Sequence, residues 1–210
     1  MLDLPDGTVL RYGIALSSGG PTRRDDPRPL VLALHPGGRG EYYGSSFMEG
    51  IVEPALRSWD AVIVAPDVPD RGWDTPRSEG LLLALVKQIQ SEYAIDARRV
   101  LVTGFSMGGR GTWYMAARHP EIFAGAIVMA GSSRPDEVAK IEIPIYLIHS
   151  PDDEVVPFEP AEAAYAALSE RGHTVDMRIL PGASHYMMGA YAPLLRLGGA
   201  WMLARWDETR

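Results

Sequence analysis

The sequence contains no cysteine, and this absence excludes several kinds of chemistry. Disulfide bonds, a thiolate nucleophile and cysteine-ligated metals all need that side chain. The five histidines are scattered, and no H-E-x-x-H pattern is present to form the zinc site typical of that motif. We therefore expect a protein without a metal or another cofactor, whose nucleophile, if it has one, is a residue other than cysteine.

Basic residues are fewer than acidic ones. The formal net charge is -7 at pH 7, because 20 lysine and arginine residues stand against 27 aspartate and glutamate residues. Sequence-independent binding to nucleic acid depends on clustered basic side chains that neutralise phosphates. Nucleic acid is therefore not an expected partner.

Long apolar runs are missing as well. None approaches the roughly 18 residues that a membrane-spanning helix needs. Residues 1–7 lack the basic and then apolar stretches of a secretory signal. These features predict a cytoplasmic protein without membrane insertion, and they leave its oligomeric state open.

What is present is the composition of an ordinary folded protein, with 46% hydrophobic and 22% charged residues. No segment resembles a linker, so we expect one domain over residues 1–210. Short apolar runs rich in β-branched residues alternate with helical patterns, which predicts an α/β fold with a mostly parallel sheet and helices on both faces. The predicted strands are residues 30–34, 61–65, 100–103, 126–130, 145–148 and 177–180, with a looser edge strand around 9–16. The predicted helices are residues 47–59, 81–93, 107–118, 161–171 and 192–206.

Residues 104–108 read G-F-S-M-G and stand directly between a predicted strand and a predicted helix. A serine at such a sharp turn needs small neighbours two residues away on either side, because strand and helix approach closely there. Gly104 and Gly108 meet this need, so Ser106 is the predicted nucleophile. The five residues alone fit a glycine-rich turn with an incidental serine equally well.

A serine hydroxyl needs a neutral imidazole to take its proton. His185 follows the last predicted strand in a loop of turn-forming residues. When a serine at a strand-to-helix turn is the nucleophile, the chain order is serine, then aspartate or glutamate, then histidine, so His185 is the predicted base. His119 and His173 are expected at the surface. His35 and His149 stand at strand ends, and we expect structural roles in which they donate to nearby backbone carbonyls.

A carboxylate must hold the imidazole in the right tautomer. Asp152, Asp153 and Glu154 follow the predicted strand 145–148, and spacing alone does not choose among them. An acidic cluster in a loop is usually a solvated turn, so we expect only one of the three to be functional.

The loop after the first parallel strand is the expected source of an oxyanion donor. Met107 at the helix start is the predicted first donor. Pro36 has no N–H, so Gly37 is the predicted second donor, with Gly38 behind it. A phosphate-cradling loop is the rival interpretation, but the lysine and the spacing of a P-loop are missing.

Aromatic residues near these motifs are candidates for substrate contacts. Tyr42 follows the oxyanion loop, Trp73 follows the strand 61–65, and Tyr186 is next to the predicted base. About ten residues, 132–141, separate two of the predicted strands at a point where related folds insert a helical cap. The sequence therefore predicts an open and shallow site without a lid.

With these motifs in order, the sequence resembles the carboxylesterase and phospholipase-type branch of the α/β hydrolases, close to dienelactone-hydrolase-like and feruloyl-esterase-like proteins. The resemblance covers about residues 30–186 and is carried by residues 35–40, 93–120 and 149–157. It implies a single α/β-hydrolase domain without a cap domain, and a serine esterase that acts on small ester molecules.

The resemblance also bears on single residues. The family pattern HG-x-x-D-x-x-VP matches residues 149–157 and implies that Asp153 is the acid of a triad with Ser106 and His185. Ser150 replaces the glycine of that pattern, and Pro36 replaces the glycine of the family's oxyanion motif. Dienelactone hydrolases proper use a cysteine nucleophile, which this chain does not have.

The expected activity is hydrolysis of esters with small or short acyl groups through an acyl-enzyme. Thioesters and some peptide bonds react through the same tetrahedral intermediate, so a thioesterase or a peptidase of the same fold is the alternative. A non-catalytic binding module on this fold is a third possibility from a different functional class.

Overall fold

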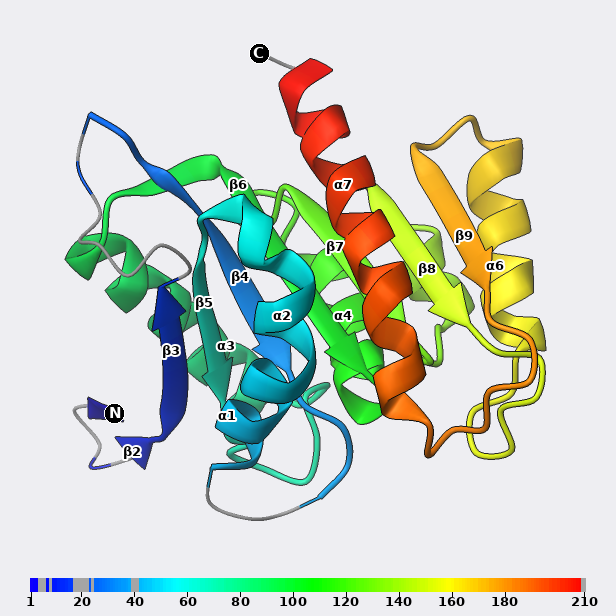
Figure 1. The fold of residues 1–210 in the computed structure, drawn as a ribbon, viewed down its shortest axis with the longest axis horizontal. Coiled ribbons are helices and arrows are strands. Elements are labelled where there is room, and N and C mark those ends of the chain that lie inside the picture. The colour runs from blue at the N-terminus through cyan, green and yellow to red at the C-terminus, as the bar shows by residue number, and fades with distance from the viewer. Residues whose placement is uncertain (4–6, 8, 17–22, 24, 39–41, 209–210) are drawn as a thin grey trace.

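The structure is a computed structural model that describes residues 1–3, 7, 9–16, 23, 25–38 and 42–208. Its centre is a seven-stranded sheet with the order β3-β5-β4-β6-β7-β8-β9 (Figure 1). All neighbouring strands are parallel except β3, which pairs antiparallel with β5. The strands are β3 (Tyr12–Leu16), β4 (Arg28–Leu34), β5 (Val62–Pro66), β6 (Ile95–Phe105), β7 (Gly125–Met129), β8 (Ile145–His149) and β9 (Val175–Ile179). The predicted mostly parallel α/β architecture is confirmed.

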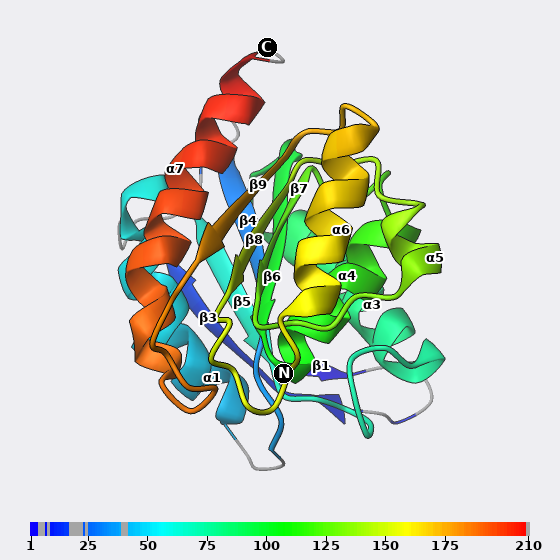
Figure 2. The ribbon, with the colours of Figure 1, turned by 90° about the vertical axis from the view of Figure 1, so that its right-hand side faces the viewer.

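Helices cover both faces of this sheet, as the edge-on view in Figure 2 shows. One face carries α3 (Pro76–Glu92), α4 (Met107–Arg118), α5 (Pro135–Val138) and α6 (Glu159–Glu170). The other face carries α1 (Tyr43–Phe47), α2 (Glu53–Leu56) and α7 (Ala192–Glu208). Each layer closes over its own cluster of buried apolar side chains. Every residue of β5, β7 and β8 is buried, because strands covered on both faces have no solvent side.

Two sequence expectations need correction. The predicted helix 47–59 is broken into α1, a π-helical turn at Met48–Val52, α2 and a 3-10 turn at Arg57–Trp59. Pro54 contributes to the break, since it has no N–H to donate to the preceding turn. The predicted edge strand 9–16 is divided between β3 and β2 (Val9–Leu10), and β2 pairs with β1 (Leu2–Asp3) outside the main sheet.

The carboxyl ends of the parallel strands meet along the lower edge of the sheet in Figure 1. In open parallel sheets this edge is where ligands bind and catalytic groups gather. Between β7 and β8, where every residue is described, the chain forms only the four-residue helix α5. The loops at this edge therefore carry the candidate site without a helical cap built from that segment.

Candidate active site

Ser106 occupies the sharp turn between β6 and α4. Its backbone has φ 56° and ψ -114°, a conformation that is strained for a residue with a side chain and costs on the order of 1–3 kcal/mol. A Cβ on Gly104 would lie 2.7 Å from the Leu34 carbonyl oxygen, and one on Gly108 would overlap that same oxygen. Only glycine fits at both positions, so close packing of β6 and α4 against the end of β4 maintains the turn and presents Ser106 at the sheet edge.

His185 connects Ser106 to Asp153. Its Nε2 lies 2.8 Å from the Ser106 hydroxyl oxygen, and its Nδ1 lies 2.8 Å from Asp153 Oδ2. Because an ionised carboxylate can only accept, Nδ1 carries the proton and Nε2 is left to accept from the serine hydroxyl. The His185 ring packs against Phe105, with ring centroids 5.1 Å apart, which helps to fix its plane.

The Asp153 side chain is fully buried. Burial acts to raise its pKa, but three hydrogen bonds outweigh burial and hold the pKa below its usual value. These bonds come from the His185 ring and from the backbone N–H groups of Val155 and Val156, which donate to Oδ1 at 2.9 and 2.8 Å. Asp153 is therefore ionised at neutral pH and orients the imidazole.

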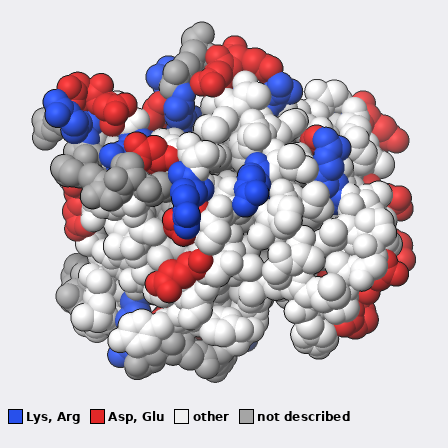
Figure 3. Space-filling model, in the orientation of Figure 1, with Lys and Arg blue, Asp and Glu red and all other residues white. Residues whose placement is uncertain are grey.

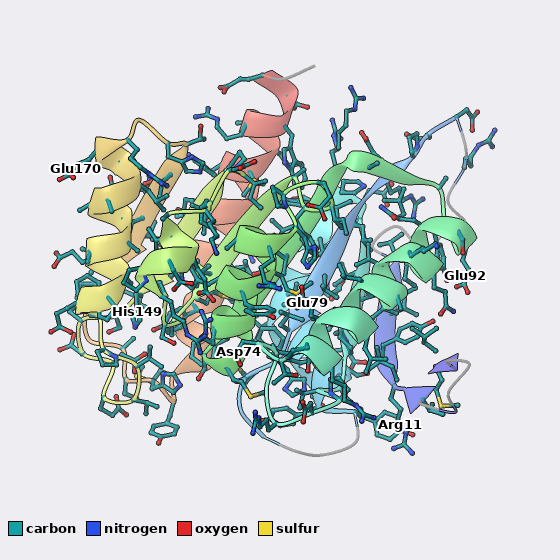
Figure 4. All side chains as sticks on the ribbon, turned by 180° about the vertical axis from the view of Figure 1, so that it is seen from behind. Arg11, Asp74, Glu79, Glu92, His149 and Glu170 are labelled. Atoms are coloured by element: carbon teal, nitrogen blue, oxygen red, sulfur yellow. The ribbon has the colours of Figure 1, made fainter. Side chains whose placement is uncertain are left out.

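None of the other histidines connects Ser106 to a carboxylate, although His149 Nε2 lies 3.6 Å from Asp153 Oδ2. His35 Nδ1 donates to the Pro36 carbonyl at 2.6 Å, and His149 Nε2 lies 3.0 Å from the Val156 carbonyl, the backbone-carbonyl contact expected of a structural histidine. His173 contacts the Ile143 carbonyl at 2.9 Å. His119 is not a freely solvated residue, which corrects the expectation. Its ring nitrogens lie 2.8 Å from Glu79 and 3.1 Å from Glu121, because α3 brings Glu79 beside the end of α4 (Figure 4).

Burial of two histidines predicts a dependence of stability on pH. Burial lowers the pKa of both His35 and His149 below the ordinary 6.5, although backbone hydrogen bonds oppose that shift. Below pH 6.5 the unfolded chain gains protons that the folded protein binds less readily, so stability is complete above that pH and is lost as the pH falls. We expect the melting temperature to drop between pH 7.5 and 5, measured by circular dichroism. In His149→Gln the drop should be smaller, and equal drops in both proteins would contradict this interpretation.

The predicted oxyanion donors lie on adjoining segments. Met107 is the first residue of α4, so its N–H has no acceptor within the helix and lies at the positive end of the helix dipole. Gly37 is exposed, and a Cβ there would meet no described atom within 4 Å. The end of β4 contacts the start of α4, which brings the two segments together. Their role as oxyanion donors stays a prediction, and Arg39 and Gly40 of the same loop lie outside the described residues.

Trp73 does not lie at the surface of the site, and this corrects its predicted contact with substrate. The residue is fully buried, and its indole N–H donates to the His35 carbonyl at 2.9 Å. Its ring also meets the His35 ring edge to face, with centroids 5.0 Å apart. The His35 ring in turn accepts from the Val68 N–H at 3.0 Å. Trp73 therefore holds His35, the first residue of the loop that contains Gly37.

This support makes Trp73→Phe informative. Phenylalanine keeps an aromatic ring against His35 but loses the N–H that holds the His35 carbonyl. We expect kcat for a short ester to fall about tenfold with little change in KM, because one hydrogen bond contributes on the order of 1 kcal/mol to the loop position. Steady-state kinetics on the folded variant test this. A raised KM with an unchanged kcat would instead support direct contact between Trp73 and substrate.

Two other aromatic candidates are exposed to solvent. Tyr42 is 67% exposed and Tyr186 is 80% exposed, and the Tyr186 ring meets the His185 ring with centroids 5.9 Å apart. Asp67 at the end of β5 fixes the segment of Tyr42 by accepting from the backbone N–H groups of Tyr42 and Gly44 at 3.0 and 2.9 Å. Both tyrosines remain available for a substrate, and their predicted roles stay predictions.

Sequence patterns did not reveal an ion network beside the nucleophile helix. Arg110 forms a bidentate pair with Glu137 of α5 and also donates to Asp74 at 3.2 Å. Arg134 donates to the same Asp74 oxygen at 3.2 Å, and Figure 4 shows Asp74 on the face that carries α3 and α4. These ion pairs connect α4, α5 and the loop after β5. No spacing rule pairs residues so far apart in the chain, so only the tertiary structure could show them.

Among the described residues, no group of three or more histidine, aspartate or glutamate side chains is placed to hold a metal ion. No helix in the described ranges has the length and apolar character to cross a membrane.

The mostly parallel sheet, the serine at the strand-to-helix turn and the histidine between that serine and Asp153 are the features of an α/β-hydrolase fold. Solved structures agree over nearly the whole chain. A thermostable esterase matches with a TM-score of 0.83 and 26% identity, covering 97% of this chain and 61% of that one. Est1E from Butyrivibrio proteoclasticus matches with a TM-score of 0.76 and 15% identity, covering 97% of this chain and 98% of that one, which shows the fold alone.

The chain belongs to the dienelactone hydrolase family, which matches residues 71–193. Among curated relatives, the carboxylesterase SOBER1 of Arabidopsis thaliana is 30% identical over 145 residues, which is 62% of this chain and 61% of SOBER1. The chain spans between 50% and 61% of the length of the first curated relatives that it matches.

Proposed function

We propose that this protein hydrolyses carboxylic esters with small or short acyl groups through an acyl-enzyme on Ser106. The observation that carries the proposal is the His185 ring, whose two nitrogens lie 2.8 Å from Ser106 and 2.8 Å from Asp153. Proximity of this kind lets the imidazole take the serine proton as the hydroxyl attacks, while the carboxylate stabilises the imidazolium that forms.

The reaction then proceeds in two halves. Ser106 Oγ attacks the ester carbonyl, its proton passes to His185 Nε2, and the N–H groups of Met107 and Gly37 receive the developing oxyanion. The protonated imidazole gives its proton to the leaving alkoxide, which departs as the alcohol. Water, deprotonated by the same nitrogen, attacks the acyl-enzyme and releases the acid.

The local charge favours esters over acyl-CoA thioesters. Acidic side chains gather along the edge that carries α6, on the right in Figure 3, and Glu159 and Glu162 lie in the first turn of this helix. This helix directly follows the loop that carries Asp153, and the net charge of the chain is -7. A polyanionic carrier would approach against this field, whereas a neutral ester would not.

The preferred acyl length follows from the short segment between β7 and β8. Each methylene gains about 0.8 kcal/mol only if it is buried, and the segment between β7 and β8 offers only α5 as a wall. On p-nitrophenyl esters we expect the highest kcat/KM with acyl groups of roughly two to six carbons. Acyl-CoAs and aminoacyl anilides, assayed in parallel, should react far more slowly. Highest kcat/KM on dodecanoyl or longer esters would contradict the proposal, and faster cleavage of an anilide or acyl-CoA would favour the peptidase or thioesterase.

A further inference from the structure

Two loops meet at the triad, and their contacts extend beyond the bond between Asp153 and His185. We call residues 150–158, between β8 and α6, the acid loop, and residues 180–187, after β9, the base loop. Asp152 Oδ2 accepts from the Gly182 N–H at 2.7 Å, and Glu154 Oε2 accepts from the His185 backbone N–H at 3.0 Å. Three consecutive carboxylates of the acid loop therefore bind the base loop, where the sequence predicted a single functional one.

The base loop has little regular structure of its own. It contains Gly182 at φ 77°, and within the loop the Met187 N–H donates to the Ser184 carbonyl at 3.0 Å. At its start, the Leu180 N–H donates to the His149 carbonyl at 2.9 Å. Between these points the backbone N–H groups of Gly182 and His185 are bound by Asp152 and Glu154, and the Glu154 bond is the one made directly to the backbone of His185.

A small shift would be enough to impair the triad. The ring must reach Ser106 and Asp153 at the same time, both at 2.8 Å, and a misplacement of about 1 Å can lower a rate on the order of 100-fold. A bond to the backbone N–H of the histidine restrains the point from which the ring projects. The bond from Asp153 restrains the His185 ring but not the His185 backbone.

We propose that Glu154 is a positioning residue for the catalytic base, and that Asp152 assists it at Gly182. Both charge-assisted bonds hold the base loop against the acid loop, so that the imidazole is aligned before substrate binds. The proposal rests on the proposed function, since it concerns the same base. Glu154 is exposed and does not contact the reacting atoms, so it acts through His185 alone.

Two substitutions of Glu154 separate the effect of its side-chain length from the effect of its negative charge. Glu154→Gln loses the charge but keeps an oxygen that can accept from the His185 N–H. Glu154→Asp keeps the charge but is one methylene too short. If Glu154 positions the loop, Glu154→Gln should stay within about threefold of the wild-type kcat, while Glu154→Asp and Glu154→Ala should lose about 10-fold to 100-fold, with KM little changed. If the charge alone mattered, Glu154→Asp would be the active variant and Glu154→Gln the impaired one, which would overturn the proposal.

The pH profile of kcat provides the second readout. Loss of alignment lowers the plateau without moving the midpoint, whereas loss of a nearby negative charge moves the midpoint. Glu162→Gln, which removes an exposed carboxylate of α6 outside both loops, is the matched charge control and should resemble the wild type. Melting temperatures of all variants show that the assays compare folded proteins. If Glu154→Asp and Glu154→Ala, assayed as folded proteins, keep the wild-type kcat, the inference is wrong.

Labelling of the wild type by a fluorophosphonate distinguishes this failure from failure of the proposed function. An active, labelled wild type together with undiminished Glu154 variants overturns only the positioning role. A wild type that neither labels nor hydrolyses any ester overturns the proposed function itself, and the positioning role with it.

Discussion

Replacing Ser106 by alanine is expected to lower turnover of p-nitrophenyl acetate by a factor on the order of 10³ or more while the fold stays intact. Without the hydroxyl no acyl-enzyme forms. His185 Nε2, which lies 2.8 Å from the Ser106 hydroxyl oxygen in the wild type, then has no hydroxyl to deprotonate. Any residual activity would come from binding and from the oxyanion donors. Alanine keeps the Cβ that already tolerates φ 56° at this position, so no new backbone strain arises.

The same variant separates an enzyme from a binding module. A fluorophosphonate labels only an activated serine, so the wild type should be labelled and Ser106→Ala should not. Ser132→Ala, at an exposed serine after β7, is the matched control and should keep both labelling and activity. Activity of Ser106→Ala within tenfold of the wild type would exclude Ser106 as the nucleophile.

Asp153→Asn should lower kcat by up to about 10⁴ with a modest change in KM. Asp153 Oδ1 accepts from two backbone N–H groups, so the asparagine oxygen must take that place and its NH₂ must face the ring. An NH₂ donor there requires His185 Nδ1 to accept, which moves the ring proton to Nε2. The base is then protonated on the nitrogen that should take the serine proton.

The matched control is the neighbouring aspartate. Asp152 Oδ2 accepts a single N–H, from Gly182, and an amide oxygen can still accept that bond, although more weakly than a carboxylate. Asp152→Asn should therefore stay within a few-fold of the wild type in the same ester assay, with folding checked by circular dichroism. If Asp152→Asn were the crippled variant and Asp153→Asn nearly normal, the alignment of the family pattern would be wrong by one residue.

Several predictions from the sequence depended on local chemistry, and the structure agrees with them. Gly104 and Gly108 indicate that the backbones of strand and helix approach more closely than any other residue would permit. The position of His185 after the last strand indicates that it lies at the edge of the sheet. Patterns of this kind involve only a few neighbouring residues, so they can be recognised from the sequence without the tertiary structure.

Other features could not be predicted from neighbours in the chain. Trp73 stands after a strand end, as a pocket residue would, but its indole is buried and holds the His35 carbonyl. Glu154 stands in an acidic cluster that looks solvated, but it accepts from a residue 31 positions away. Arg110 pairs with Glu137 across 27 positions. These outcomes depend on the direction in which each loop side chain points.

The sequence by itself therefore determined the α/β architecture, the serine turn and the loop that supplies the base, because hydrophobic period and turn residues act over short stretches. Spacing alone left three carboxylates open and the family pattern indicated Asp153, but only the tertiary structure showed what Asp152 and Glu154 bind, how Trp73 holds the His35 carbonyl and which charges pair. Ser106 and His185 are 79 positions apart, and His185 and Asp153 are 32 apart. Contacts over such separations exist only once the strands are in register, so the alignment of the triad is a property of the folded sheet.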